Sequence, residues 1–338
     1  MGLSRPIVIG VNVAVIGMGL IGGSLMRALA GSGHWVIGYD LDPSTRAMAR
    51  TAAAQAPKDS RWQVAASVGD AVASADLAVI ATPLTAAAQV LDAIASAGFT
   101  GLVTDVVSVK QPMRELVAQR LTAEGLRLAG YVGGHPMAGK ETAGFAATDP
   151  NLFTGAAWVL CLDEETSLDD WLVLARLVTS LGARVVPTTA EDHDKVVAAV
   201  SHVPHLLAVA LAGAIAADPL AATLAAGSFR DATRVAGSPP ELIASMCGGN
   251  AGPVVEALDG VLDQLEAVRE QLAAGDAIPA IRAWAGPAHT ARIRWPHGWG
   301  EPEPLPVTVD NLLALGDEGG WVTAVSSDGR TVTVARPV

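Results

Sequence analysis

Cysteines and aromatic residues are both scarce in this chain of 338 residues. The two cysteines, Cys161 and Cys247, lie far apart, with neither metal-ligand spacing nor the number that a disulfide framework needs. We therefore expect both thiols to be buried, reduced and inert. Aromatic residues make up 4% of the chain but hydrophobic residues 51%, which predicts a core packed mainly through alanine, valine and leucine.

Positive charge is also in short supply. Lysine and arginine together number 22 against 34 acidic residues, a net charge of -12. This balance disfavours nucleic acid and anionic membranes as partners, because both are bound by basic patches. A small anionic substrate is compatible with it, provided that the site supplies local cations.

A secretory signal peptide is not recognisable, because the first residues lack its separate charged region, apolar segment and cleavage site. The longest apolar run, residues 196–217, is long enough to span a bilayer. Ser201, His202, Pro204 and His205 interrupt it. We therefore predict a helix buried between protein layers, in a soluble, cytoplasmic protein.

The strongest positive signal is a strand, a glycine turn and a helix at residues 11–30. Gly17, Gly19 and Gly22 fit the pattern G-x-G-x-x-G. The first glycine permits a sharp turn, the second lets a pyrophosphate approach the backbone, and the third lets helix and strand pack closely. Leu20 and Ile21 open the helix, whose N-terminal N–H groups would face the phosphates. The segment predicts a dinucleotide site.

The next predicted strand, residues 35–39, ends in Asp40. This is close to the offset at which an acidic side chain accepts hydrogen bonds from the adenosine ribose. Asp42 follows, and no arginine or lysine occurs before Arg46. Two carboxylates would repel the 2'-phosphate of NADP, so we predict NAD as the cofactor.

Strand and helix patterns alternate through the first half of the chain, as in a doubly wound parallel sheet of the α/β class. We expect strands at 64–66, 77–81, 102–105, 128–132, 156–162 and 184–187. Ligands bind beyond the carboxyl ends of such strands. The segments that follow the strands are therefore the candidate site, and they include Thr82 and Pro83 for the cofactor.

After about residue 190 the pattern changes to helices, expected at 190–217, 219–234, 239–246 and 253–274. We divide the chain into a Rossmann-like NAD-binding domain at 1–188, an all-helical substrate and dimerisation domain at 189–295, and a tail at 296–338. The tail contains a predicted β-hairpin around SSDG, and nothing in it suggests chemistry. The apolar surface of the helical domain predicts a homodimer.

His135 is the candidate catalytic base, because it lies in a loop rich in glycine and proline directly after a predicted strand. Hydride transfer to nicotinamide from a carbon that bears a hydroxyl leaves a proton, which an imidazole can accept near neutral pH. Ser108, in the preceding loop, could hydrogen-bond the imidazole and orient it. Lys110 could contribute, or could equally be an exposed residue at the start of a helix.

His202 and His205 would lie on one side of the apolar helix, where buried imidazoles either bond to backbone or line a cavity. No cysteine or carboxylate completes a ligand set there, so we predict no metal. Further on, Arg230 and Arg234 flank Asp231. One arginine could pair with Asp231, which leaves the other to bind a substrate carboxylate through two hydrogen bonds.

Five segments together resemble the prephenate/arogenate dehydrogenases of tyrosine biosynthesis. They are GMGLIGGS at 17–24, DVVSVK at 105–110, GGHPMAGKETAG at 133–144, SHVPH at 201–205 and RDATRVA at 230–236, in the family's order. The resemblance implies a first domain that binds the nicotinamide cofactor and a helical second domain that forms the dimer. It also implies oxidative decarboxylation of prephenate to 4-hydroxyphenylpyruvate with NAD, or of arogenate to tyrosine.

The resemblance also implies roles for single residues. His135 is similar to the family's histidine that takes the proton of the hydroxyl at C4, and Ser108 to the serine that supports it. Arg234, more than Arg230, matches the arginine that holds a substrate carboxylate. His205, and less clearly His202, resembles a histidine that lines the substrate pocket, and Glu141 matches an acidic position near the site. Two alternatives use these residues differently. A related dehydrogenase for a 3-hydroxy acid would have Lys110 at its centre, and a non-enzymatic NAD(H) sensor need not keep the set together.

Overall fold

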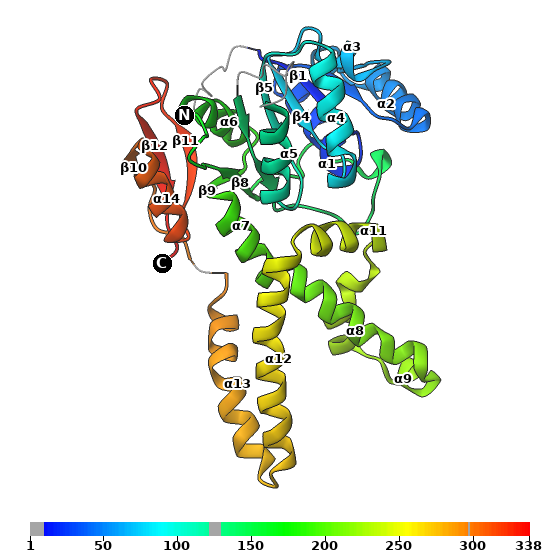
Figure 1. Cartoon of the computed structure of the whole chain (residues 1–338), viewed down its shortest axis with the longest axis vertical. Helices are drawn as coiled ribbons and strands as arrows, with labels where there is room; N and C mark the ends of the chain where they lie inside the picture. The colour runs from blue at the N-terminus through cyan, green and yellow to red at the C-terminus, as the bar shows by residue number, and fades with distance from the viewer. Residues whose placement is uncertain (1–9, 122–129, 297) are drawn as a thin grey trace. The chain divides into compact units, whose positions relative to one another are not determined.

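The structure is a computed structural model that describes residues 10–121, 130–296 and 298–338. The chain divides into two compact units (Figure 1). Unit 1 comprises Met1–His193 together with Glu301–Arg336, and unit 2 comprises Asp194–Gly300 with Pro337–Val338. Unit 2 therefore interrupts unit 1 in the sequence.

The first sheet of unit 1, sheet A, is parallel throughout, with the strand order β3-β2-β1-β4-β5-β6. Its strands are β1 (Asn12–Ile16), β2 (Trp35–Tyr39), β3 (Gln63–Val64), β4 (Leu77–Ile80), β5 (Leu102–Asp105) and β6 (Gly130–Val132). The connecting helices are α1 (Leu20–Gly31), α2 (Pro43–Gln55), α3 (Val68–Val72), α4 (Leu84–Ser96) and α5 (Gln111–Leu121). The order reverses between β1 and β4, which confirms the predicted doubly wound sheet.

Alternation of small apolar residues explains why β1 and β4 lie at the centre of sheet A. On β1, Val13 and Val15 pack into one buried cluster, whereas Ala14 and Ile16 pack into another on the opposite face. Strand β4 divides its residues between the same two clusters. Strands covered on both faces need apolar residues at every position, as these sequences have.

The second sheet, sheet B, is mixed, with the order β10-β12-β11-β9-β8-β7. Its strands are β7 (Gly134–Pro136), β8 (Ala157–Cys161), β9 (Arg184–Thr188), β10 (Glu303–Pro306), β11 (Trp321–Val325) and β12 (Thr331–Ala335). The strands expected at 156–162 and 184–187 therefore belong to this separate sheet and not to the doubly wound one. Strand β7 follows the edge strand of sheet A after Gly133 alone, so the chain steps directly between the sheets.

The C-terminal tail forms the predicted hairpin, since β11 and β12 pair antiparallel. The hairpin also joins unit 1, because Val322 on β11 pairs with Val185 on β9. Helix α14 (Val309–Asp317) and strand β10 were not expected from the sequence. A Cβ at Gly316 of α14 would overlap the carbonyl oxygen of Pro187, so the tail helix packs closely on the end of β9.

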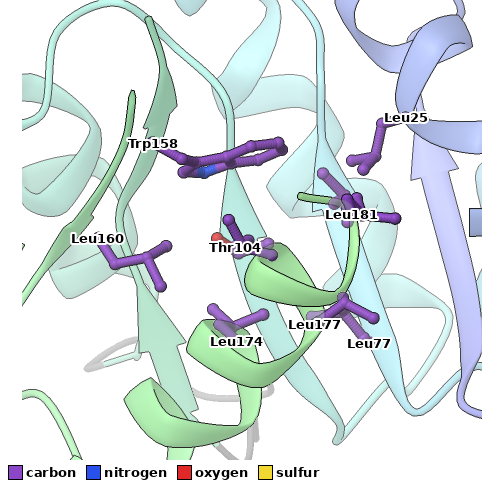
Figure 2. A pocket seen from close by; sticks show the side chains of 10 residues that line it. Leu25, Leu77, Thr104, Trp158, Leu160, Leu174, Leu177 and Leu181 are labelled. Carbon is purple, nitrogen blue, oxygen red and sulfur yellow. The ribbon is translucent and has the colours of Figure 1, made fainter. Parts of the chain in front are cut away.

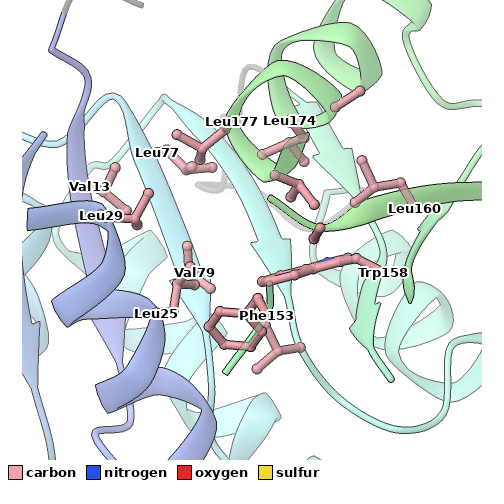
Figure 3. Packing of buried hydrophobic residues seen from close by; sticks show 14 of the residues in the cluster. Val13, Leu25, Leu29, Leu77, Val79, Phe153, Trp158, Leu160, Leu174 and Leu177 are labelled. Atoms are coloured by element: carbon pink, nitrogen blue, oxygen red, sulfur yellow. The ribbon is translucent and has the colours of Figure 1, made fainter. Parts of the chain in front are cut away.

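Helix α6 (Leu168–Ser180) links the two sheets through a shared core. Figure 3 shows Leu174 and Leu177 of α6 beside Leu77 of sheet A, with Trp158 and Leu160 of sheet B nearby. Figure 2 shows the side chains that line a small pocket at this contact, among them Leu77, Trp158 and Leu174. The cavity has a volume of about 20 Å³. A gap of this size admits about one water molecule, so it is a packing defect and not a ligand site.

His34 at the start of β2 gives the stability of unit 1 a pH dependence. The imidazole is buried, its Nδ1 accepts a hydrogen bond from the Val11 N–H at 3.3 Å, and burial lowers the pKa of His34 below its usual 6.5. The unfolded chain therefore binds this proton more readily than the folded one. The stabilising contribution is complete above pH 6.5 and is lost as the pH falls toward the lowered pKa of the folded state.

We expect His34→Gln to flatten the pH dependence of unfolding. The free energy of unfolding of the wild type, measured by urea denaturation, should fall between pH 7 and 5 by on the order of 1 kcal/mol more than that of the variant. His289→Gln serves as a control, because His289 is exposed, and it should keep the wild-type slope. Identical slopes for wild type and His34→Gln would contradict the prediction.

Unit 2 is helical, as predicted. It contains the end of α7 (Ala190–Val197), α8 (Val203–Ala217), α9 (Pro219–Leu224), α10 (Gly227–Thr233), α11 (Pro240–Ile243), α12 (Ala251–Ala273) and α13 (Ala277–Arg294). Two π-helical segments, Ala198–His202 and Ala244–Gly248, interrupt the expected regular helices. Such segments insert one residue into a helical turn and often occur at functional sites.

The apolar helix was expected to be buried between layers, and this expectation is wrong for the single chain. On α8 only Val203 and Ala208 are buried, whereas Val209, Leu211 and Ile215 are exposed. Among the described residues, one helical stretch, Ala190–Ala217, has the length and composition that could cross a membrane. A helix packed against a second protein chain passes the same test.

Candidate active site

The carboxyl edge of β1 and β4 holds the glycine turn. Gly17 has φ of +102°, and a Cβ there would lie 2.5 Å from the Ala81 carbonyl oxygen. A Cβ at Gly22 would overlap the Gly17 carbonyl oxygen, whereas one at Gly19 would meet no atom within 4 Å. The turn therefore requires glycine at position 17 and the helix packing requires it at position 22. Gly19 leaves open space beside the backbone.

Helix α1 begins at this turn with its N-terminal N–H groups uncapped. Gly19 is the N-cap residue, no side chain caps the helix, and its first turn has no acidic residue. Leu20 and Ile21 are half-buried. An uncapped helix N-terminus beside open backbone is suited to a pyrophosphate.

Thr82 and Pro83 follow β4 at the same edge. Pro83 precedes α4 as its N-cap residue. Thr82 Oγ1 is buried without a hydrogen-bond partner in the described chain, and Thr82 Cγ2 lies beside the position of a Gly17 Cβ. An unpaired buried hydroxyl costs free energy, so this side chain fits a bound group at the turn. The edge as a whole fits a dinucleotide.

Asp40 lies at the end of β2 and forms a hydrogen bond with the backbone of the glycine turn. Its Oδ2 accepts a hydrogen bond from Met18 N at 2.7 Å, and its Oδ1 accepts one from Asp42 N at 2.9 Å. Each carboxylate oxygen has a further lone pair, so Asp40 can still accept from ribose hydroxyls. Asp42 caps α2 through Thr45 and Ser44, and the hydrogen bonds from Thr45 lower the pKa of the Asp42 carboxyl.

His135 lies on β7, the edge strand of sheet B, where it pairs with Val159. Its Nδ1 is 2.9 Å from Nε2 of His193 on α7. The ring centroids are 5.1 Å apart and the ring planes cross at 74°. His193 is buried, and sequence reasoning missed it. Its position shortly after β9, at the start of a helix, was the available signal.

Ser108 follows β5 and is half-buried. Within the described residues its side chain makes no hydrogen bond, so the expected bond to His135 is not present in this structure. The side chain that contacts His135 Nδ1 is instead His193.

Lys110 is fully buried, which corrects the interpretation of it as an exposed residue at a helix start. Its Nζ bonds the carboxylate of Asp105 and donates to the Gly134 carbonyl oxygen at 2.7 Å. Asp105 also accepts from the hydroxyl of Tyr131 at 2.7 Å. Burial first, and then Asp105, raise the pKa of Tyr131 well above 10, so its hydroxyl remains a donor.

This buried network fixes the residue before His135. Gly134 N is 3.4 Å from Asp105 Oδ2, and a Cβ on Gly134 would lie 2.6 Å from the Asp105 carbonyl oxygen. The side chain and the carbonyl group of Asp105, at the end of β5, therefore hold the start of β7 at the point where the chain passes from sheet A to sheet B.

The loop after β7 contains Glu141, which is exposed. The later part of this loop is held on α1, because Arg27 Nη1 donates to both Thr148 oxygens at 2.9 Å. Ser24 Oγ also accepts from Asp149 N at 2.9 Å. The loop that follows His135 and the helix that follows the glycine turn are thus tied together.

In unit 2, the two histidines of the SHVPH segment have different partners. His202 is buried, and its Nδ1 lies 3.2 Å from Nδ2 of Asn250. His205 is half-buried, and its Nδ1 lies 2.8 Å from the Ser201 carbonyl oxygen. A carbonyl only accepts, so the proton of His205 is on Nδ1 and the lone pair of the neutral ring is on Nε2. For His202 the amide donor implies the opposite tautomer.

Arg230 and Arg234 both line a surface hollow of unit 2. The hollow is lined by Ala225, Ala226, Phe229, Arg230, Thr233, Arg234 and Gly237. The expected ion pair with Asp231 is wrong, because neither arginine pairs with Asp231 in the part of the chain that the structure describes. Both arginine residues are exposed.

The cysteines and possible metal ligands add no site. Cys161 is buried, as expected, but Cys247 is only half-buried, and burial raises the pKa of its thiol. No cluster of three or more His, Cys, Asp or Glu side chains among the described residues could hold a metal ion.

Two models of protein domains match most of the chain. The nucleotide-binding domain of prephenate dehydrogenase matches residues 25–187, and the dimerisation domain of prephenate dehydrogenase matches residues 189–283. The chain belongs to the prephenate dehydrogenase family. Family membership makes it an oxidoreductase, and it assigns the exposed apolar face of α8 to a dimerisation domain.

Individual relatives of the family cover most of the chain. Prephenate dehydrogenase of Bacillus subtilis is 31% identical over 274 residues, 79% of this chain and 71% of the relative. A candidate prephenate dehydrogenase of Corynebacterium glutamicum has a solved structure that is 36% identical, with a TM-score of 0.74 over 84% of this chain and 88% of its own. Arogenate dehydrogenase of Synechocystis is 27% identical, with a TM-score of 0.68 over 84% of this chain and 99% of its own.

Proposed function

We propose that this chain catalyses the NAD-dependent oxidative decarboxylation of prephenate to 4-hydroxyphenylpyruvate in tyrosine biosynthesis. The observation that carries the proposal is the family match across both the nucleotide-binding and the dimerisation domain. Supporting it are the open glycine turn, the unpaired hydroxyl of Thr82 and the contact of His135 on β7 with His193 on α7. We further propose that the protein works as a homodimer in the cytoplasm.

The proposed mechanism divides the work among the residues described above. NAD supplies the acceptor for the hydride that leaves C4 of the substrate ring. The N-terminus of α1 and the turn at Gly19 would hold the pyrophosphate of the cofactor, and Asp40 would accept hydrogen bonds from its ribose. His135 takes the proton of the C4 hydroxyl at Nε2 as the carbon is oxidised. Arg234 holds a substrate carboxylate.

Loss of the ring carboxylate as CO2 completes the reaction. The electron pair of the broken carbon–carbon bond enters the ring, which becomes aromatic, and the oxygen at C4 takes back the proton that His135 holds, which restores the hydroxyl of the product. Aromatisation supplies the driving force, so the protein mainly has to orient the substrate and to take up and return one proton. In this scheme His205, His202 and Glu141 are further substrate-binding residues, and the side chain beside His135 Nδ1 is that of His193 and not the expected Ser108.

Arogenate is the alternative substrate, favoured by the similarity to the Synechocystis arogenate dehydrogenase. The two substrates differ in a keto or an amino group on the side chain. The test is the rate of reduced-cofactor formation by the purified protein with prephenate and with arogenate, each offered NAD and NADP. Turnover of prephenate with NAD supports the proposal, turnover of arogenate alone supports the alternative, and turnover in none of the four mixtures overturns both.

We expect Asp40→Asn to raise the use of NADP relative to NAD. Removing one negative charge beside the ribose relieves repulsion of the 2'-phosphate, and a change of about tenfold in the ratio of kcat/KM values corresponds to about 1.4 kcal/mol. Asp76→Asn is a matched control, because Asp76 also accepts a backbone N–H, from Asn12 at the opposite end of β1. An unaltered cofactor ratio in Asp40→Asn would show that the ribose contact lies elsewhere.

We expect Arg234→Ala to weaken substrate binding more than it lowers kcat. Loss of a charge-assisted contact to a carboxylate costs on the order of 2 to 5 kcal/mol, so KM should rise by about 30-fold or more. Arg230→Ala, which removes the neighbouring guanidinium of the same hollow, is the matched comparison and should have the smaller effect. The reverse order of effects would assign the carboxylate to Arg230.

A further inference from the structure

The contact between His135 and His193 suggests a chemical role for the imidazole of His193. The two rings come from different elements, β7 and α7, and their nitrogens approach to 2.9 Å. His193 is buried, and its ring meets that of His135 edge to face. Two neutral imidazoles at this distance share one hydrogen, which one nitrogen donates and the other accepts.

The role proposed for His135 decides the direction of that hydrogen bond. A neutral imidazole carries its proton on one nitrogen and its lone pair on the other. If Nε2 is to accept the substrate proton, the ring proton must be on Nδ1. His135 must then donate from Nδ1, and Nε2 of His193 must accept.

We propose that His193 is a positioning residue, whose Nε2 accepts the Nδ1–H of His135 and so keeps the lone pair of His135 on Nε2 for the substrate. This inference rests on the proposed function of His135 as the base. It assigns to a neutral imidazole the place that a carboxylate or backbone carbonyl often takes beside a functional histidine.

A neutral imidazole as the acceptor beside His135 makes the base depend on pH in a way that a carboxylate would not. The pair can hold one positive charge, but a second proton would place two like charges 2.9 Å apart and is opposed. If His193 takes a proton at Nε2 first, it becomes the donor to His135 Nδ1, and the lone pair on Nε2 of His135 is replaced by a hydrogen. The pair therefore titrates as a unit, and its base activity is lost as the pH falls.

Other titratable groups lie on the elements that hold the pair. They are Glu191, Asp192, Asp194 and Lys195 on α7, Cys161 on β8, Asp163 after β8, and the Asp105–Lys110 pair that bonds Gly134. Asp192 accepts from Thr189 Oγ1 at 2.6 Å, and Asp163 accepts from Ala190 N at 3.0 Å. Both carboxylates thus form hydrogen bonds at the N-terminus of α7, the helix that carries His193.

The test compares His193→Gln with His193→Ala. The amide oxygen of glutamine can accept the hydrogen from His135 Nδ1 but does not take up a proton, whereas alanine does neither. We expect His193→Ala to lower kcat by about 10- to 100-fold with KM values for substrate and cofactor within about twofold of wild type. His193→Gln should recover most of kcat, and its pH profile should change because only one imidazole of the pair still titrates.

A second measurement reads the tautomer without any turnover. Histidine labelled with 15N in both ring positions distinguishes the protonated from the unprotonated nitrogen by NMR, with His135→Asn identifying the His135 signals. We expect the proton on Nδ1 of His135 in the wild type and in His193→Gln, and a mixture of both tautomers in His193→Ala. His34→Gln, which removes a buried imidazole elsewhere in unit 1, controls for lost stability and should leave kcat and the His135 signals unchanged.

These measurements separate failure of the inference from failure of the proposed function. If the wild type turns over none of the four mixtures but the tautomer depends on His193, the function is wrong and the hydrogen bond stands. If the wild type is active and His193→Ala matches it in kcat and in the His135 tautomer, the inference is overturned. A loss in His193→Ala that His193→Gln does not recover also overturns the role of His193 as an acceptor.

Discussion

Replacing His135 with asparagine is expected to lower kcat by on the order of 10²- to 10⁴-fold, the range that a positioned general base contributes. The asparagine amide can still donate to His193, so the local packing is retained. It cannot accept a proton near neutral pH, so the C4 hydroxyl keeps its proton as hydride leaves. Because a base acts mainly in the transition state, KM for the substrate and for NAD should change little.

Steady-state kinetics with saturating NAD, backed by calorimetric titration of NAD alone, checks this expectation. His34→Asn is the matched control, since it removes another buried histidine of unit 1 far from the carboxyl edge of sheet A. A His135→Asn enzyme with turnover comparable to wild type would exclude His135 as the base. It would also remove the reason for the tautomer assigned to the histidine pair.

Replacing Lys110 with methionine is expected to lower the free energy of unfolding by about 3 to 5 kcal/mol. The change leaves the Asp105 carboxylate buried without its cation and the Gly134 carbonyl without its Nζ donor. Urea denaturation of the two proteins measures the difference. The same change at Lys140, whose ion pair with Asp149 is about one-third exposed, should cost less than about 1 kcal/mol.

The double variant Lys110→Met with Asp105→Asn tests whether the two charges act together. If they do, the double variant should be less destabilised than the sum of the single variants by about 0.5 to 3 kcal/mol. Additive losses would mean that each residue acts through other partners. A loss at Lys110 no larger than that at Lys140 would contradict the assignment of Lys110 as a structural cation.

Local patterns in the sequence were sufficient for sheet A. β2 and β5 have the predicted bounds, because each is a short apolar run that ends in an aspartate at the edge of a parallel sheet. Sheet B was not predictable in this way. The strand at 184–188 looks the same whether it joins sheet A or pairs with a hairpin more than a hundred residues later, and only the long-range pairing of Val185 with Val322 decides between them.

The candidate site shows the same division. The glycine turn and Asp40 are local signals, since turn, helix and strand follow one another within residues 12–40. The contact between His135 and His193 joins positions 58 apart, and the burial of Lys110 depends on Gly134, 24 positions away. Side chains that meet between distant segments follow no fixed spacing in the sequence. These contacts, and the roles that depend on them, could therefore not be predicted from the sequence.

The place of the tail in sheet B also constrains how the protein is made. Strand β9 leads into the helix that carries His193, and its other side is completed by β11. On a ribosome, β9 emerges well over a hundred residues before β11 does, and the whole helical unit is synthesised in between. Until then β9 presents an unpaired edge, the kind of surface on which chains associate wrongly. Expression of a version cut before Glu301 should therefore yield aggregates, even though every residue assigned to catalysis would be present.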